Sequence, residues 1–457
     1  MLIRVLRYVA VVAVVCCVGV SRGADASGQS APATGIPQDF ELSNGSRIHI
    51  GGDLRMRWET IDPEVVNPDA GKAPAMQYLR VRTRVWGSLE LPDAGATMYL
   101  RLANRAHYYS SNYTADPNNT GAATWRFPDE TVLDNLYLKL KHDEFTAIVG
   151  RQDLVLGSGM WFAEGCPYVQ ARSFFHDGVT LRYDSEDGAD HLVLFSFYDT
   201  WKDGSVFIND QNRRLRLGNI FTAGLFGSHR FTDLATLELY YMYNDVEDKG
   251  WGPVRGHRLN NNMSLHTAGF RVHGNLNEQF SYSVELARQF GYNDTHDDNQ
   301  GVMADNRIRW KAPKETPFQP EIGLQYLYLS GDKDSTNRNE GWVPLMAEYP
   351  IFREELLAVT FNGNWTNLHV ERAEFVIRPL KDLKLTFAPG LFQADTADKA
   401  GCTGGGHSVG TTLAAFLDYK LTDHISIAGE ICRFKPGDFY GSGKSSLWSR
   451  TQILFTF

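Results

Sequence analysis

Arginine recurs at every second position in one stretch of the N-terminal quarter of the sequence. In residues 78–91, YLRVRTRVWGSLEL, Arg80, Arg82 and Arg84 alternate with apolar or small residues. Alternate side chains of an extended strand point to opposite faces, so the three guanidinium groups are expected on one face. Arginine stays charged in confined surroundings and presents a planar fork that fits a carboxylate or a phosphate. A row of such forks along an enclosed passage would concentrate anions and exclude cations.

The same period of two predicts further charged residues on this face. On the first three segments of this kind, eight arginines including Arg47 face only three acids, one of which is Glu59, although the net charge of the chain is −9. These arginines could pair with the acids and brace a wall, or they could line an anion path. The surplus of positive charge favours the second interpretation. The residues expected to line this path are Asp53, Arg55, Arg57, Arg80, Arg82, Arg84, Glu90, Arg101, Arg105, Arg182, Arg271 and Arg450.

The segments that carry these residues have strand periodicity throughout. We expect eighteen strands and no helix, near residues 47–60, 78–91, 96–108, 131–141, 144–156, 176–184, 190–200, 218–230, 234–246, 263–275, 278–291, 302–312, 318–331, 366–378, 382–393, 408–420, 423–434 and 445–457. Short joins alternate with long polar ones. Short turns on one rim and long loops on the other are typical of an all-β, antiparallel transmembrane β-barrel. Lipid cannot hydrogen-bond a backbone, so such a sheet must close, and about eighteen strands enclose a space too wide for side chains alone to fill.

The two ends of the chain agree with this fold class. The last residues, SSLWSRTQILFTF, alternate apolar and polar side chains and end on Phe457, as expected of a closing strand with an aromatic at the lipid edge. Residues 1–26 read as a secretory signal peptide, residues 27–45 as a flexible periplasmic lead-in and residues 46–457 as the barrel. An even number of strands would place both termini on the periplasmic side.

Other chemistry has weak support in the sequence. The acidic stretch at residues 293–299 and the pair Asp332 and Asp334 could bind Ca²⁺, but solvated loops explain them better. No metal or cofactor is expected, and no G-x-S-x-G, H-E-x-x-H or P-loop motif is present. After removal of the signal peptide, Cys402 and Cys432 could form a disulfide, or the cysteines could have no functional role.

Several motifs stand together in a familiar order: GGDLRMRWE, YLRVRTRVWGSLEL, DNLYLKL, IVGRQDLVLGSG, RSFFHDGVTLRY and YLYLSGD. In this order they resemble the alginate export family of outer-membrane porins, over roughly residues 48–457. The resemblance implies an eighteen-stranded monomeric barrel with an arginine-rich constriction that passes a polyuronate. It adds Arg151 to the residues expected to line the lumen, although its parity with Phe145 and Val149 would point it at lipid unless a bulge intervenes.

The sequence therefore predicts a porin in the outer membrane of a Gram-negative bacterium. The expected partner is an anionic polysaccharide or oligosaccharide that is exported by passive diffusion. Outer-membrane lipid and periplasmic export machinery are also expected as partners, and nucleic acid is not. The long loop at residues 332–365 is expected to cover the pore or to fold into it. A general or nutrient-uptake anion porin is the first alternative. An outer-membrane lipase with a Ser/His site at the barrel rim is the second.

Overall fold

A computed structural model describes most of the chain after its N-terminal region. The described residues are 39–62, 76–109, 124–163, 175–203, 218–248, 262–293, 298–333, 335–347, 352–354, 357, 365–397, 404–441 and 443–457. They belong to one compact unit, Pro37–Phe457. The expected signal peptide and most of the expected lead-in lie outside the described residues. Within the described part, no helix is long and apolar enough to cross a membrane.

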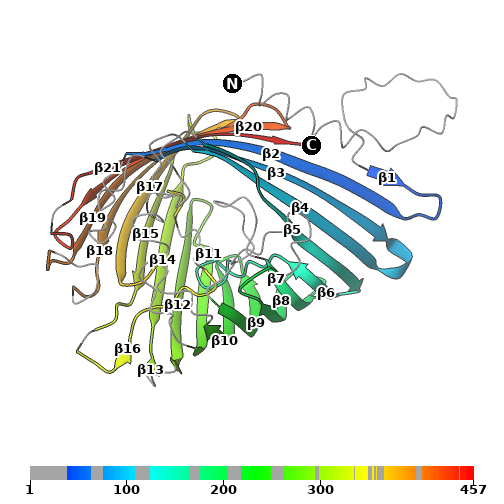
Figure 1. Cartoon of the computed structure of the whole chain (residues 1–457), viewed down its shortest axis with the longest axis horizontal. Coiled ribbons are helices and arrows are strands. Elements are labelled where there is room, and N and C mark those ends of the chain that lie inside the picture. The colour runs from blue at the N-terminus through cyan, green and yellow to red at the C-terminus, as the bar shows by residue number, and fades with distance from the viewer. Residues whose placement is uncertain are drawn as a thin grey trace. The chain divides into compact units, whose positions relative to one another are not determined.

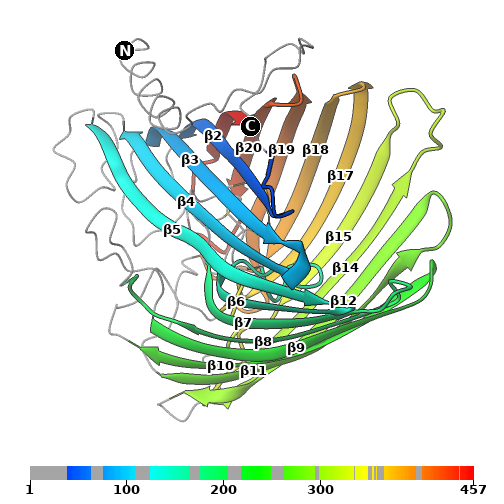
Figure 2. The ribbon, with the colours of Figure 1, turned by 90° about the vertical axis from the view of Figure 1, so that its right-hand side faces the viewer.

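Eighteen long strands form one antiparallel sheet that closes on itself (Figures 1 and 2). The long strands are β2 (Arg47–Asp62), β3 (Met76–Leu91), β4 (Ala96–Tyr109), β5 (Thr124–His142), β6 (Phe145–Gln152), β7 (His176–Asp184), β8 (Asp190–Asp199), β9 (Gly218–Thr232), β10 (Ala235–Asp248), β11 (Met263–Asn275), β12 (Phe280–Asn293), β14 (Val302–Lys311), β15 (Glu321–Leu329), β17 (Leu368–Leu380), β18 (Leu383–Gln393), β19 (Ser408–Lys420), β20 (Ile425–Pro436) and β21 (Ser446–Thr456). Three short strands, β1 (Asp39–Glu41), β13 (Asp298–Asn299) and β16 (Arg338–Asn339), add to it. The prediction of an eighteen-stranded antiparallel barrel is confirmed.

The first and last long strands close the barrel. β2 pairs with β21 from Asp53 opposite Thr456 to Asp62 opposite Leu447. At the very end of the chain, the backbone N–H groups of Gly52 and Phe457 each donate to the other residue's carbonyl oxygen, both at 3.1 Å. No long strand is left with an open edge, which is the condition for a sheet to border lipid.

Side chains alternate along the strands as the sequence predicts. On β2, Trp58 is 39% exposed whereas its neighbours Arg57 and Glu59 are 4% and 0% exposed. On β21, Ile453 and Phe455 are exposed and Arg450 is buried. We call the side of the sheet with the exposed Leu, Ile, Phe and Trp residues the apolar face, and the opposite side the polar face.

Three predicted strands are wrong at one end. The strand expected at residues 131–141 already begins at Thr124. The strand expected at residues 144–156 ends at Gln152, two residues after Gly150, which stays paired with β7 at a φ of +123°. The strand expected from residue 318 begins at Glu321, because Phe318 and Gln319 have φ values of +62° and +42°, which an extended strand does not allow. The join between β14 and β15 is consequently longer than most turns on that rim.

Replacing Gly150 with Ala is expected to destabilise the barrel by about 1–3 kcal/mol. A Cβ atom at this φ would collide with the carbonyl oxygen of Leu136 on β5. The midpoint of urea unfolding, monitored by the gel shift between the folded and heat-unfolded forms, measures the effect. Gly227→Ala is the matched control, because a Cβ there meets only Leu192 at 3.9 Å. Equal midpoints for the two variants would contradict the assigned role of Gly150.

Candidate functional site

Seven arginines gather on the polar face of β2, β3, β4 and β21, next to the seam that closes the barrel. Arg82 lies opposite Arg55 on one neighbouring strand and opposite Arg105 on the other, and Arg57 lies opposite Arg80. Residues directly opposite each other on neighbouring strands have Cβ atoms about 5 Å apart, and like charges in such pairs repel. The arginine cluster consists of Arg55, Arg57, Arg80, Arg82, Arg84, Arg105 and Arg450.

Three carboxylates are held within the arginine cluster. Asp53 accepts hydrogen bonds from Nε of Arg82 at 3.0 Å and from Nε of Arg84 at 2.7 Å. Glu59 is fully buried and accepts from the Tyr78 hydroxyl at 2.9 Å and from Arg450 at 3.2 Å. Glu430 on β20 accepts from Arg450 at 3.2 Å. These acids thus orient the guanidinium groups of Arg82, Arg84 and Arg450.

Two other predicted arginines form ion pairs with acids outside the arginine cluster. Arg101 donates to Asp134 and to Asp153, both at 2.6 Å. Asp134 reaches Arg101 because the register of β4 and β5 shifts at this point, so one residue of β5 is left over. Burial raises the pKa of the Asp153 carboxyl in the segment after β6, although Arg101 opposes this effect. Arg271 donates to Glu238 at 2.7 Å.

The remaining predicted residues lie apart from the arginine cluster. Arg151 keeps the parity of Val149, stays in register with Asp177 without a bulge, and donates to Asp177 at 2.8 Å and to Asp203 at 3.2 Å. Arg182 is half-buried on β7, and its Nε atom is buried with no hydrogen-bond partner in the described part of the chain. Glu90 is exposed beside the turn from β3 to β4. The structure therefore brings together the predicted residues of β2–β4 and β21 other than Glu90 and Arg101, whereas Arg151, Arg182 and Arg271 lie on other strands.

Two connections pack onto the polar face and contact each other. In the first inserted segment, residues 153–163, Trp161 stacks on Tyr240 of β10 with ring centroids 4.2 Å apart. In the second inserted segment, residues 339–357, the backbone N–H of Val343 donates to Gln289 of β12 at 2.8 Å. The N–H of Ala163 donates to the carbonyl oxygen of Met346 at 2.9 Å and thereby joins the two segments. The described residues of the predicted covering loop from Gly341 onward thus pack against the polar face of the barrel wall, whereas residues 335–338 are exposed.

The second inserted segment carries an arginine that sequence periodicity did not single out. Arg353 donates to both carboxylate oxygens of Asp418, at 2.7 and 2.8 Å, and to Glu430 at 2.9 Å. Because Glu430 also accepts from Arg450, a continuous chain of charged contacts links this segment to the arginine cluster. Next to Arg353, Glu354 accepts from Arg372 of β17 at 2.6 Å.

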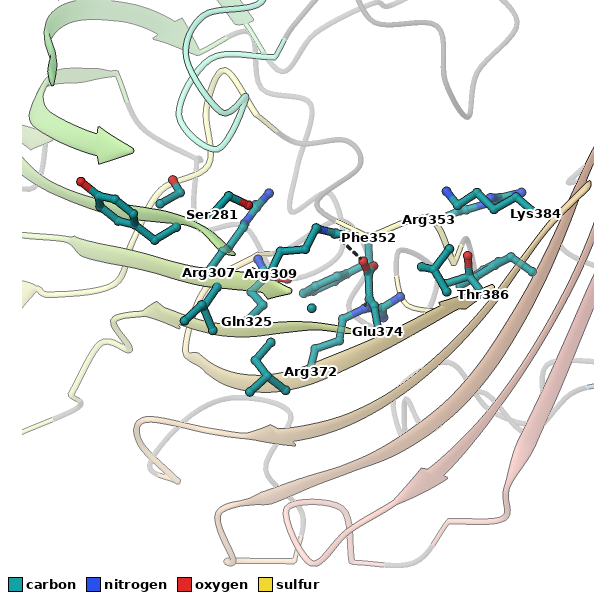
Figure 3. Close-up of a pocket in the computed structure, with 17 residues that line it drawn as sticks. Ser281, Arg307, Arg309, Gln325, Phe352, Arg353, Arg372, Glu374, Lys384 and Thr386 are labelled. Atoms are coloured by element: carbon teal, nitrogen blue, oxygen red, sulfur yellow. Dashed lines mark hydrogen bonds and ion pairs between the residues drawn. The ribbon is translucent and has the colours of Figure 1, made fainter. Parts of the chain in front are cut away.

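A cavity of about 420 Å³ lies under Arg353, between the second inserted segment and the polar face of β12–β19 (Figure 3). In the described residues no group of three or more His, Cys, Asp or Glu side chains could hold a metal ion. Both candidate Ca²⁺ loops include positions outside the described residues. Cys432 is buried with a free thiol, and Cys402 lies outside the described residues.

A closed antiparallel barrel of this size with an exposed apolar face is a transmembrane β-barrel. The model of one protein family, Alginate export, matches residues 46–452, so the chain belongs to the alginate export family. Comparison with curated proteins gave no match. Family and fold together point to a channel in the outer membrane.

Solved structures with a similar fold include proteins of Pseudomonas aeruginosa and Acinetobacter baumannii. Pseudomonas aeruginosa OccK7 (OpdD) has a TM-score of 0.55 and 13% sequence identity, over 90% of this chain and 98% of that one. Acinetobacter baumannii OccAB2 has a TM-score of 0.57 and 11% identity, over 90% of this chain and 98% of that one. At these identities the likeness extends to the fold alone.

Replacing Arg101 with Ala is expected to destabilise the barrel by about 3–5 kcal/mol, because the fully buried carboxylate of Asp134 would lose its ion pair. The urea midpoint of the folded protein measures this loss. Arg338→Ala is the control: this exposed arginine lies 4.0 Å from exposed Asp298, and such pairs contribute about 1 kcal/mol or less. If Arg101→Ala were as stable as the control, the ion pair with Asp134 would not brace the wall.

Proposed function

We propose that the protein is an anion-selective channel that passes anionic polysaccharide, in particular an alginate-like polyuronate, by passive diffusion across the outer membrane. In this proposal the polar face lines a water-filled lumen, and the rim with short turns faces the periplasm. The observation that carries the proposal is the arginine cluster on β2, β3, β4 and β21. Membership of the alginate export family supports the choice of substrate.

The arrangement of charges suits passage better than tight capture. Guanidinium forks attract carboxylates, and low-dielectric walls strengthen that attraction. Conduction also requires that each contact be weak enough for the anion to leave. Asp53 and Glu59 hold the guanidinium groups in place and compete with a passing carboxylate for the same hydrogen-bond donors. A polymer with one carboxylate on every sugar could then move from one arginine to the next.

A general anion porin would use the same charges and is the second candidate. The arginine cluster attracts small inorganic anions as well as uronates, so anion preference alone does not distinguish the two functions. An oligouronate does. A channel for polyuronate should show current interruptions when oligouronate is added, and an uncharged oligosaccharide of the same length should cause fewer. A general porin should respond alike to both sugars.

Replacing Arg80, Arg82 and Arg84 together with Gln is expected to reduce the anion preference of the open channel roughly five-fold, the effect of about 1 kcal/mol of lost attraction. The reversal potential in a planar bilayer under a KCl gradient measures the preference. The corresponding triple Lys variant, which keeps the charge, should retain most of it. Unchanged selectivity in the Gln variant of a conducting channel would overturn the assigned role of the arginine cluster.

A further inference from the structure

We propose that the cavity under Arg353 is a binding subsite for one or two uronate units of an anionic saccharide. This inference rests on the proposed function and adds a second place of contact, on the wall formed by β12–β19. The cavity of about 420 Å³ is at the small end of the range for ligand pockets, about 300–1,000 Å³. It therefore suits a short piece of a polymer.

The cations that line the cavity differ in whether acidic side chains already form ion pairs with them. Arg353 is bound by Asp418 and Glu430, and Arg372 is bound by Glu354. These two arginines hold the second inserted segment in place.

Arg307 and Lys384 are more accessible. The Arg307 side chain is 42% exposed and its ion pair is with Asp305 at 2.7 Å. Lys384 is half-buried, and within the described residues it forms no ion pair. Figure 3 shows Arg307 toward one end of the group of lining residues and Lys384 toward the other. Arg309 also lines the cavity but is bound by Glu321 and Glu374, so Arg307 and Lys384 are the cations that we assign to a uronate carboxylate.

A buried hydroxyl group also lacks a partner at this site. Thr386 is 9% exposed and lines the cavity near Lys384 (Figure 3), and its Oγ1 atom has no hydrogen-bond partner among the described residues. A buried polar atom without a partner costs free energy, so a group that bonds to it on binding is favoured. A sugar hydroxyl can both donate to and accept from Thr386. Ser281, Ser283 and Gln325 supply further hydroxyl and amide groups on the lining.

Arginine side chains already cover two aromatic rings of the cavity, those of Phe352 and Phe416. The guanidinium group of Arg353 lies 4.7 Å from the ring centre of Phe416, and that of Arg372 lies 5.3 Å from the ring centre of Phe352. Both rings are buried. Stacking of a sugar on these rings is therefore not part of the proposed mode of binding, which depends on charge and hydrogen bonds.

A second cavity lies beside the subsite, nearer to one rim of the barrel. It has a volume of about 300 Å³, and Lys384 lines both cavities. Its other cations, Arg378, Lys381 and Lys420, lie at or beside the turns that follow β17 and β19. A uronate chain that enters from the rim with short turns would meet these cations first and would reach the subsite at Lys384.

The test is current block of the purified channel by a hexauronate in planar bilayers. The double variant Arg307→Gln, Lys384→Gln is expected to raise the dissociation constant for block roughly ten-fold, as for the loss of charge-assisted hydrogen bonds. Thr386→Val is expected to raise this dissociation constant a few-fold, because the substitution removes only the hydroxyl group of Thr386. Lys311→Gln is the matched control, since Lys311 ends the same strand as Arg307 and lines neither cavity.

The outcomes separate this inference from the proposed function. If the double variant folds, conducts and is blocked by hexauronate as strongly as the Lys311→Gln control, the subsite is refuted while the anion channel stands. If the unmodified channel has no anion preference, the proposed function fails. Folding of each variant is checked by its gel shift, and titration calorimetry of hexauronate into the detergent-solubilised protein provides a second readout that does not depend on current. Equal affinities in calorimetry for the double variant and the control would also overturn the inference.

Discussion

A sheet that borders lipid must satisfy every backbone hydrogen bond internally, and the pairing of β2 with β21 meets that constraint. The rest of the structure depends on this seam. Closure fixes the register of β2 against both β21 and β3, and the register decides which side chains lie opposite each other. Arg450, Glu59 and Tyr78 come into contact across these three strands for this reason. The strand register that closes the barrel thus also sets the contacts within the arginine cluster.

The arginine cluster places like charges opposite each other, which a sheet ordinarily avoids. Two devices offset the repulsion. Carboxylates of Asp53 and Glu59 lie between guanidinium groups and accept hydrogen bonds from them. The covalent and hydrogen-bonded frame of a closed barrel also prevents the strands from separating. Arg101 and Arg271 lie outside the cluster and pair with Asp134 and Glu238.

The inserted segments bring the polar face into contact with residues far away in the sequence. Arg353 binds Glu430, which also binds Arg450 of the arginine cluster, so the position of the second inserted segment and the orientation of the cluster are coupled. The first inserted segment is held by the stacking of Trp161 on Tyr240 and by its hydrogen bond to Met346. Side chains from both connections therefore share the interior with the strand residues.

Periodicity in the sequence was sufficient to predict the barrel and the arginines of β2–β4, because a strand repeats every two residues and its face follows from parity. Periodicity could not predict contacts that depend on a register shift or on a residue outside the strands. Asp134 reaches Arg101 through a register shift, and Arg353 comes from a connection with no period. Arg151 shows the opposite case: parity set it apart from the other arginines, and it binds Asp177 and Asp203 instead. Asp418 and Glu430 were not singled out because their partner is more than sixty residues away.

The central claim is that fixed positive charge on the polar face selects anions, and its most direct test is the reversal potential of the unmodified channel at two ionic strengths. Screening shortens the reach of a charge from about 10 Å at 0.1 M salt to about 3 Å at 1 M. We expect a clear anion preference at the lower concentration that weakens at the higher one. A cation preference, or no preference at 0.1 M, would contradict the account.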